Sequence, residues 1–143
     1  MAIAVKEITL WRREVENRPG TMASTLAPLT EAGANFRVVM GYRYPGDESK
    51  AAVEIFPVAG KKQIAAAQQA GLSPAEFPAL IVEGDDRPGL GHRFASSVAD
   101  AGINMSFLVA QVVGRKYSAI FGFETKEDAR AAAAVIKKAA AKR

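Results

Sequence analysis

The sequence has no cysteine and one histidine, and each of these shortages excludes a class of chemistry. Without cysteine the chain can form no disulfide and has no thiolate for catalysis or metal binding, which fits a reducing compartment. The one histidine, His92, cannot build a multi-histidine metal site, and no nucleophile stands in a pattern with a base. The acidic residues show no spacing typical of a metal site or of paired acid–base catalysis. We therefore expect no catalytic residue, no bound metal and no cofactor, and we expect that the protein is not an enzyme.

Long apolar runs are also missing from the sequence. No stretch approaches the roughly 20 apolar residues that a membrane-spanning helix needs. The N-terminal sequence MAIAVKEITLW lacks the basic start and the apolar run of a secretion signal. These absences predict a cytoplasmic protein that has no contact with a membrane.

The net charge is +4, and unbalanced cations stand near the C-terminus at Lys137, Lys138, Lys142 and Arg143. A basic surface can bind nucleic acid, but such surfaces usually interleave aromatic side chains that stack on bases. No aromatic residue lies among these cations. They are better explained as the last turn of a helix, whose dipole favours positive charge, and we expect no nucleic-acid binding.

The chain has the composition of a globular protein, with 49% apolar and 24% charged residues. Much of the apolar share consists of 28 alanines, and each alanine buries little area. The core should therefore be thin, and burial against another domain or a second chain would strengthen it.

A repeat with a step of 69 residues organises the sequence. Asn17, Arg18, Pro19 and Gly20 recur as Asp86, Arg87, Pro88 and Gly89, and Glu31, Ala32, Gly33 and Asn35 recur as Asp100, Ala101, Gly102 and Asn104. Two marks, Asx-Arg-Pro-Gly and acid-Ala-Gly-x-Asn, thus stand at the same separation in both halves. We therefore predict two copies of one unit, with residues 1–72 as the first domain and residues 73–143 as the second.

Each Asx-Arg-Pro-Gly mark stands between a predicted strand and a predicted helix. Residues 7–15 and 79–84 are short stretches rich in β-branched and aromatic residues, which is typical of strands. Proline is favoured in the first turn of a helix, and apolar residues then recur at helical spacing in both copies. Gly33 and Gly102 are predicted to end these helices as left-handed caps.

The rest of each copy predicts a hairpin and a closing helix. Residues 36–44 alternate with one apolar side, and residues 51–58 form the return strand. In the second copy the hairpin covers residues 104–123, and its strands are apolar on both sides, which predicts cover on both faces. Closing helices follow at 61–70 and from Thr125, where Thr-x-x-Asp resembles a capping box. A further short strand is expected around Glu76 and Phe77.

This order, βαββα with an optional last strand, predicts an α+β fold of two ferredoxin-like repeats. Each repeat should be an antiparallel sheet with both helices on one face. The second copy ends on a helix without a final strand, while the N-terminus carries more residues than its strand needs. We expect the N-terminal extension, or a second chain in a homodimer, to cover the exposed edge, because bare edges invite uncontrolled pairing.

The repeat resembles tandem ACT domains, the small βαββαβ regulatory modules attached to many enzymes of amino-acid metabolism. The resemblance rests on ENRPG with EAGAN in the first copy and on DDRPG with DAGIN in the second. The first stretch is similar to the serine-binding regulatory domain of bacterial phosphoglycerate dehydrogenases. The resemblance implies a small amino acid as the ligand, held between domains at strand-to-helix loops, and a regulated enzyme as a partner.

The resemblance also implies which residues contact the ligand. In ligand-binding family members the Asx of the first mark and the Asn of the second hydrogen-bond the amino acid, and the glycine lies close to it. By position these residues are Asn17, Gly20 and Asn35 in the first copy, and Asp86, Gly89 and Asn104 in the second. Gly91 and His92 stand on the same second loop and complete the candidate ligand-binding set. Such a loop has free N–H groups for a carboxylate, and an Asx side chain can accept a hydrogen bond from an ammonium group.

Structural roles also explain these residues. Asn17 and Asp86 would serve as helix caps or turn residues, and the asparagines of the second mark would hold the backbone after the glycine. The arginines of the first mark, Arg18 and Arg87, are interpreted as solvated. We expect an amino-acid-binding regulatory module, and the alternative is a protein-interaction or oligomerisation module that needs no ligand.

Overall fold

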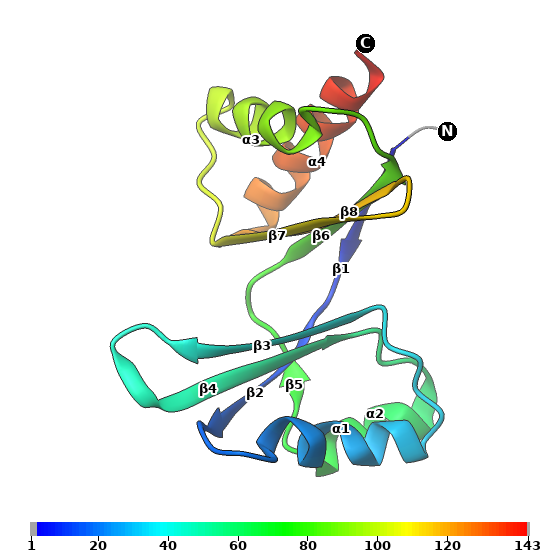
Figure 1. Cartoon of the computed structure of the whole chain (residues 1–143), viewed down its shortest axis with the longest axis vertical. Coiled ribbons are helices and arrows are strands. Elements are labelled where there is room, and N and C mark those ends of the chain that lie inside the picture. The colour runs from blue at the N-terminus through cyan, green and yellow to red at the C-terminus, as the bar shows by residue number, and fades with distance from the viewer. Residues whose placement is uncertain (1–2, 143) are drawn as a thin grey trace. The chain divides into compact units, whose positions relative to one another are not determined.

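The computed structural model describes residues 3–142, which form four helices and eight strands (Figure 1). In chain order the elements are β1 (Ala4–Ile8), β2 (Trp11–Glu16), α1 (Thr21–Glu31), β3 (Val38–Tyr44), β4 (Asp47–Phe56), α2 (Gly60–Gln69), β5 (Ser73–Pro74), β6 (Ala79–Asp85), α3 (Leu90–Asp100), β7 (Phe107–Val113), β8 (Lys116–Gly122) and α4 (Lys126–Ala141). The strands make two four-stranded antiparallel sheets, so the predicted α+β fold of two βαββα repeats is confirmed.

The chain divides into two compact units. Thr9–Ala75 form one unit, and the other consists of the chain up to Ile8 together with everything from Glu76 onward. The boundary expected between residues 72 and 73 thus lies close to the end of the first unit. The N-terminal strand, however, belongs with the second repeat.

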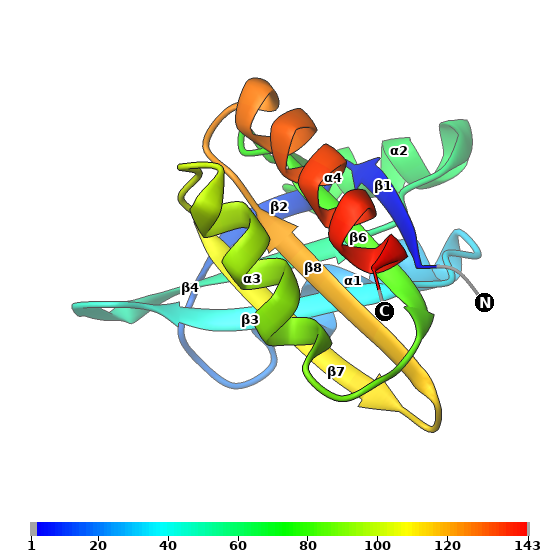
Figure 2. The same ribbon diagram turned by 90° about the horizontal axis from the view of Figure 1, so that it is seen from above.

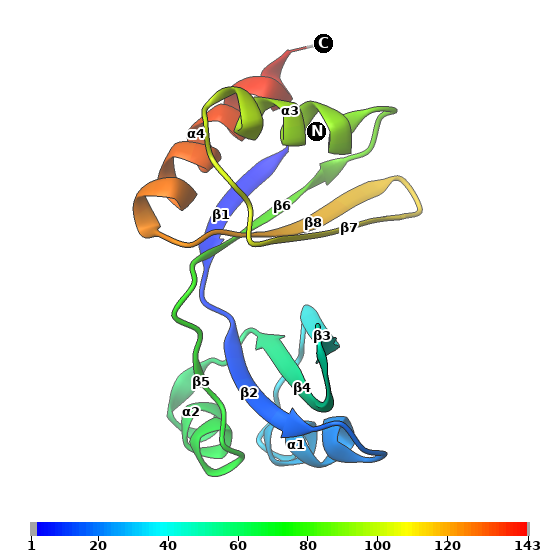
Figure 3. The ribbon, with the colours of Figure 1, turned by 90° about the vertical axis from the view of Figure 1, so that its left-hand side faces the viewer.

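The unit Thr9–Ala75 has the strand order β3-β4-β2-β5, with α1 and α2 on one face of the sheet (Figure 3). Its core gathers apolar side chains from both layers: Val15, Leu29, Val53, Ile55, Ala67, Ala70 and Leu72. The prediction of a strand around Glu76 and Phe77 is wrong. The strand is β5, at Ser73–Pro74, and it pairs with Trp11 and Arg12 of β2 because the chain turns back directly after α2.

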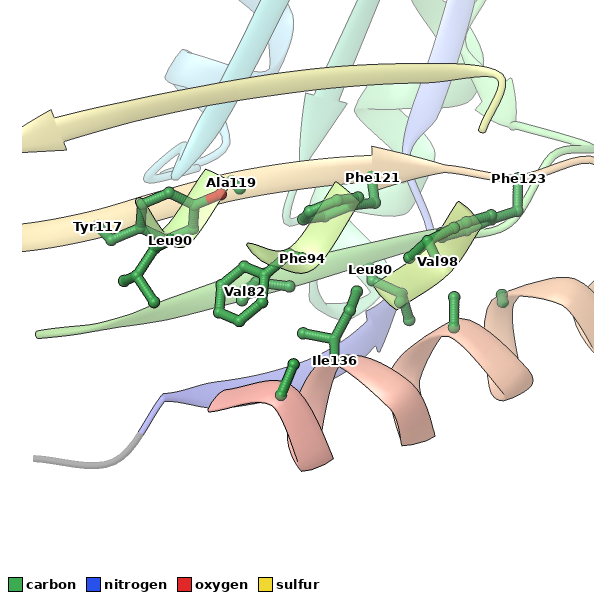
Figure 4. Packing of buried hydrophobic residues seen from close by; sticks show 13 residues of the cluster. Leu80, Val82, Leu90, Phe94, Val98, Tyr117, Ala119, Phe121, Phe123 and Ile136 are labelled. Carbon is green, nitrogen blue, oxygen red and sulfur yellow. The ribbon is translucent and has the colours of Figure 1, made fainter. Parts of the chain in front are cut away.

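The other unit has the strand order β1-β6-β8-β7, with α3 and α4 side by side on one face (Figure 2). Ala4 to Ile8 of β1 pair antiparallel with Glu83 to Ala79 of β6. The expectation that the N-terminal extension covers the exposed edge of the second repeat is therefore confirmed. The core includes Leu80, Val82, Leu90, Phe94, Val98, Tyr117, Phe121, Phe123 and Ile136 (Figure 4).

The prediction that both faces of the second hairpin are covered is wrong for its first strand. β7 is the last strand of its sheet and pairs only with β8 among the described residues. Its apolar side chains are among the exposed ones: Leu108 37%, Val109 50%, Val112 51% and Val113 66%. An edge strand has a neighbour on one side only, which explains why apolar character did not translate into burial.

The predicted apolar side of residues 36–44 lies on the sheet face opposite α1 and α2. A Cβ added at Gly41 would meet Met22 of α1 at 2.4 Å, so Gly41 faces the helices and its neighbours on β3 face away. On that outer face two tyrosine hydroxyls donate hydrogen bonds, from Tyr42 to Glu54 (2.7 Å) and from Tyr44 to Glu14 (2.9 Å). The face is thus partly polar rather than apolar throughout.

The helix ends follow the sequence signals closely. Gly33 and Gly102 have positive φ after α1 and α3, and the Thr125 side chain accepts a hydrogen bond from the Asp128 N–H at 3.0 Å, which confirms the predicted caps. Prolines of the first mark lie before the helices rather than in their first turn, because Gly20 and Gly89 take up left-handed conformations between them. Over residues 3–142, every helix is too short or too polar to cross a bilayer.

Candidate functional site

In the first repeat, Asn17 ties the loop between β2 and α1 to the neighbouring strand. Its N–H donates to the Ser49 carbonyl at 2.9 Å, and its side-chain Nδ2 donates to the Glu48 carbonyl at 2.7 Å. Gly20 follows with φ of 90° and forms the N-cap of α1. The amide group of Asn17 is therefore engaged with the β3–β4 hairpin, and its oxygen is the atom that remains for a ligand.

The second repeat has the same strand-to-helix loop, but a different side chain is buried next to it. The Asp86 N–H donates to the Arg115 carbonyl at 2.8 Å, and Gly89 caps α3 with φ of 85°. Tyr117 lies beneath this loop and is 4% exposed. Burial, and next the negative charge of Asp86, raise the pKa of the Tyr117 phenol.

The interpretation of Asn17 and Asp86 as helix caps is wrong, whereas their role in the turn has support. The N-cap residues are Gly20 and Gly89, and neither helix has a side-chain cap hydrogen bond. A Cβ added at either glycine would meet nothing within 4 Å. The positive φ, and not crowding, is what requires glycine there, and it leaves open space beside each loop.

The asparagines of the second mark lie at the far ends of the helices. Asn35 follows the C-terminal end of α1 and Asn104 that of α3, and both are exposed. Because α1 has 11 residues, roughly 16 Å separate its two ends. One repeat by itself therefore does not bring Asn17 and Asn35, or Asp86 and Asn104, to the same place.

A cavity of about 240 Å³ lies beside the first loop, between β2 and the beginning of α1. Its lining combines both signs of charge with hydroxyl groups: Arg13, Glu14, Val15, Glu16, Arg18, Thr21 and Ser24. Beyond Arg12, no described strand pairs with β2 on the side of β5, so part of the backbone of β2 is also open here. A small zwitterion would meet cations, carboxylates and hydroxyls in this cavity.

Hydrogen bonds hold the lining of this cavity in place. Arg13 donates from Nη1 to the Thr25 hydroxyl at 3.1 Å, and Thr25 donates to the Thr21 carbonyl at 2.7 Å. Arg18 pairs with Glu16 at 2.9 Å, with both side chains largely exposed, which agrees with the interpretation of Arg18 as solvated. The cavity thus has a half-buried, fixed cation on one wall and an exposed ion pair at its mouth.

None of the residues that line this cavity, Arg13 among them, belongs to the candidate ligand-binding set predicted from the sequence. A signal was present, since Trp11, Arg13 and Val15 alternate along β2 and therefore share the face that packs on the helices. A cation at a core-facing position of a strand is unusual unless it has a partner, so this position could have been selected from the pattern.

A second hollow, of about 530 Å³, lies between α3 and α4. Gly91 and His92 lie in the first turn of α3 rather than on the loop before it, and His92 lines this hollow, with its Nε2 at 3.3 Å from the Ser96 Oγ. The interpretation of Arg87 as solvated is wrong, because Arg87 donates to the carbonyls of Ala140 (3.1 Å) and Lys142 (2.6 Å) at the end of α4. Cations suit that end of a helix, so Arg87 has a structural role.

Between residues 3 and 142 no three histidine, aspartate or glutamate side chains gather in a way that could hold an ion.

Comparisons with known proteins identify the fold. No protein-family model and no curated protein matches the sequence. Solved structures match over nearly the whole chain. Protein BT0572 from Bacteroides thetaiotaomicron has a TM-score of 0.75 at 9% identity, with 94% of this chain and 89% of that chain covered.

Two regulatory parts of aspartate kinase also match. The ligand-free regulatory subunit from Thermus thermophilus has a TM-score of 0.64 at 16% identity, with 97% of each chain covered. A putative C-terminal regulatory domain from Porphyromonas gingivalis has a TM-score of 0.57 at 12% identity, with 99% of this chain and 97% of that chain covered. The chain therefore has the tandem ACT-type fold of aspartate kinase regulatory domains, and the resemblance inferred from the repeat is confirmed at the level of the fold.

Proposed function

We propose that this chain is a regulatory module that binds a small amino acid at a strand-to-helix loop. The observation that carries the proposal is the cavity between β2 and the beginning of α1, where cations, carboxylates and hydroxyls line a space of about 240 Å³. Asn17 and Gly20 lie in the loop that joins these two elements and are not among the residues that line the cavity. A free amino acid carries one carboxylate and one ammonium group, and these charges match the lining. Two of the matched structures are named as regulatory parts of aspartate kinase, which supports a regulatory role without catalysis.

Regulation would follow from binding. A ligand that binds one arrangement of such a module better than another shifts the population toward it, and a partner that distinguishes the arrangements then changes its activity. The partner we propose is an enzyme of amino-acid metabolism. For the candidate pairs Asn17 with Asn35 and Asp86 with Asn104 to contact one ligand, the second asparagine has to come from another copy of the fold, because each pair spans a helix.

A thermal-shift scan against the common amino acids tests the proposal. One or two amino acids should raise the melting temperature, because a ligand that prefers the folded state stabilises it by about 2.7 kcal/mol at 100 times its dissociation constant. Asn17→Ala and Asp86→Ala then report which loop binds, through selective loss of the shift. If no amino acid changes the melting temperature at millimolar concentration, the proposal fails.

The alternative is a ligand-free interaction or oligomerisation module, and the exposed apolar side chains of β7 favour it. Val109 and Val113 are 50% and 66% exposed on one face of an edge strand, which is typical of a surface that pairs with another chain. Light scattering with and without the amino-acid panel separates the two functions. A ligand-independent dimer that dissociates after Val113→Lys, with no thermal shift for any amino acid, would favour the alternative.

A further inference from the structure

We propose that the two repeats have diverged, so that only the first binds the ligand, and that Arg13 is the group that binds the ligand's carboxylate. This inference rests on the proposed function and narrows it to one loop and one cation. The inference depends on a side chain of β2 that faces the helices. This residue, Arg13, lies outside both repeated marks.

Arg13 is held in a defined position. It extends from β2 on the face that packs on the helices, and its Nη1 donates to the hydroxyl of Thr25, which is 0% exposed. Thr25 is fixed in turn because its hydroxyl donates to the Thr21 carbonyl at 2.7 Å. A Cβ added at Gly71 would come within 3.1 Å of the Arg13 Nε, so the guanidinium also lies close over the chain after α2. A cation fixed in this way is preorganised for binding.

Arg13 has no anionic partner in the part of the chain that the structure describes. The one hydrogen bond of its side chain goes to the neutral Thr25 hydroxyl, and no ion pair includes it. A half-buried charge without a counterion is costly, and a carboxylate is the partner that a guanidinium binds most strongly. Because Arg13 also lines the cavity, the carboxylate of a ligand can supply the missing negative charge.

Two carboxylates that also line the cavity, Glu14 and Glu16, are candidates for the ammonium group. Glu14 is already engaged, since it accepts from Tyr44 at 2.9 Å and pairs with Lys50 at 3.3 Å. Among residues 3–142, Glu16 pairs with Arg18 alone, and both of these side chains are exposed. A surface ion pair of this kind contributes little and exchanges readily, so Glu16 can turn to an ammonium group.

The second repeat has lost this chemistry. At the step of 69 residues, Arg13, Thr21 and Thr25 become Val82, Leu90 and Phe94. These three apolar residues are 0%, 2% and 0% exposed, and they pack beside Tyr117 in the core (Figure 4). No cation stands at the matching position, so the second loop keeps the Asx-Arg-Pro-Gly turn for its structure alone.

The test compares variants of the full chain by thermal shift and calorimetry, with the amino acid that stabilises the wild type as the probe. Arg13→Gln should weaken its affinity by roughly thirtyfold or more, as is typical when one partner of a charge pair is removed. Arg13→Lys should retain part of the affinity, because it keeps the charge and loses the fork geometry. Thr25→Val should weaken binding less than Arg13→Gln, since it removes only the group that positions Arg13.

Arg12→Gln is the matched control. Arg12 precedes Arg13 on β2, points to the opposite face and lies over the Tyr44 ring at 5.5 Å from its centroid. The Arg12→Gln substitution removes one positive charge from β2, as Arg13→Gln does. The affinity for the amino acid should remain within about twofold of the wild type. Asp86→Ala should leave the affinity unchanged, and the stoichiometry should be one amino acid per chain.

Each outcome decides a different claim. If no amino acid binds the wild type, the proposed function and this inference both fall. If an amino acid binds and Arg13→Gln retains the affinity while circular dichroism shows it folded, only the inference is overturned. Two ligands per chain, or loss of binding in Asp86→Ala, would also overturn it and leave the proposed function standing.

Discussion

Tyr117 places a hydroxyl group in an apolar core. The side chain is 4% exposed and meets Phe94 edge to face, with 5.7 Å between the ring centroids. Its hydroxyl has no hydrogen-bond partner among the described residues. A buried polar group without a partner costs about 1 to 3 kcal/mol, so this residue lowers the stability of the second repeat relative to an apolar ring of the same shape.

Tyr117→Phe should therefore raise the free energy of unfolding, by about 1 kcal/mol, because it removes the unpaired hydroxyl and keeps the ring contacts. Denaturant unfolding measures the change. Tyr42→Phe is the contrasting variant, since the Tyr42 hydroxyl donates to Glu54 at 2.7 Å and its removal should destabilise the protein. A loss of stability in Tyr117→Phe equal to that in Tyr42→Phe would mean that the Tyr117 hydroxyl is paired in solution.

At the level of single elements, the strand residues Gly122 and Gly41 differ in the side chain that packs over them. A Cβ at Gly122 of β8 would lie 2.1 Å from the Phe107 ring on the adjacent strand β7, whereas one at Gly41 would meet the end of the flexible Met22 side chain. An aromatic ring over a glycine in a cross-strand pair is a packing contact that an added methyl group would disrupt.

Gly122→Ala should destabilise the chain by about 1 to 3 kcal/mol, because the Phe107 ring has to leave its place over β8. Gly41→Ala should cost less, since the Met22 methyl group can move to another rotamer. Chemical denaturation of both variants gives the comparison. Equal costs would show that the ring in β7 moves as freely as the methionine.

Elements were predictable from the sequence where local signals agree. Helices α1, α3 and α4 follow from apolar spacing and from the cap residues Gly33, Gly102 and Thr125, whose interactions lie within a few residues of each other. The short strand β5 was misplaced because its two residues gain their conformation from pairing with β2, which lies more than sixty residues earlier. The side chains of β7 are exposed because β7 is an edge strand of its sheet, and the apolar content of a segment does not reveal its position in a sheet.

For the candidate site, the sequence predicted where the loops lie but not which side chains line the cavity. The repeated Asx-Arg-Pro-Gly mark located both strand-to-helix loops, and in the structure each loop has a glycine with positive φ. The chemistry of the cavity depends on Arg13 meeting Thr25 across the layer between sheet and helix. That contact joins two residues with no shared motif, so it becomes visible only after the fold brings them together.

At the scale of the whole molecule, the strand β1 (Ala4–Ile8) belongs to the sheet of the second repeat. Residues 4–8 cover β6, and Ile3 and Val5 pack against the core of that unit. The first repeat uses no part of β1 in its own sheet. The two repeats therefore depend on the N-terminal segment to different extents.

A chain that begins at Thr9 should lose stability in one unit only. Without β1 the β6 edge is bare and the contacts of Val5 are gone, so amide hydrogens of β6 and β8 should exchange faster, while those of β2 and β4 keep their protection. Hydrogen exchange measured by mass spectrometry distinguishes the two units. The full-length variant Lys6→Ala, which changes an exposed side chain of β1, is the control and should behave as the wild type. Equal loss of protection in both units would contradict this division of the chain.

The pairing of β1 with β6 also makes the first repeat an insertion within the second. Ile8 and its partner Ala79 stand 71 positions apart, since 79 minus 8 is 71. At the usual rate of synthesis on the ribosome, of about 5 to 20 residues per second, β1 waits roughly 4 to 15 seconds for its partner strand to be made. The unit Thr9–Ala75 is therefore made in full before β6, α3, β7, β8 and α4, so it can fold first, whereas the other unit has to wait for these elements.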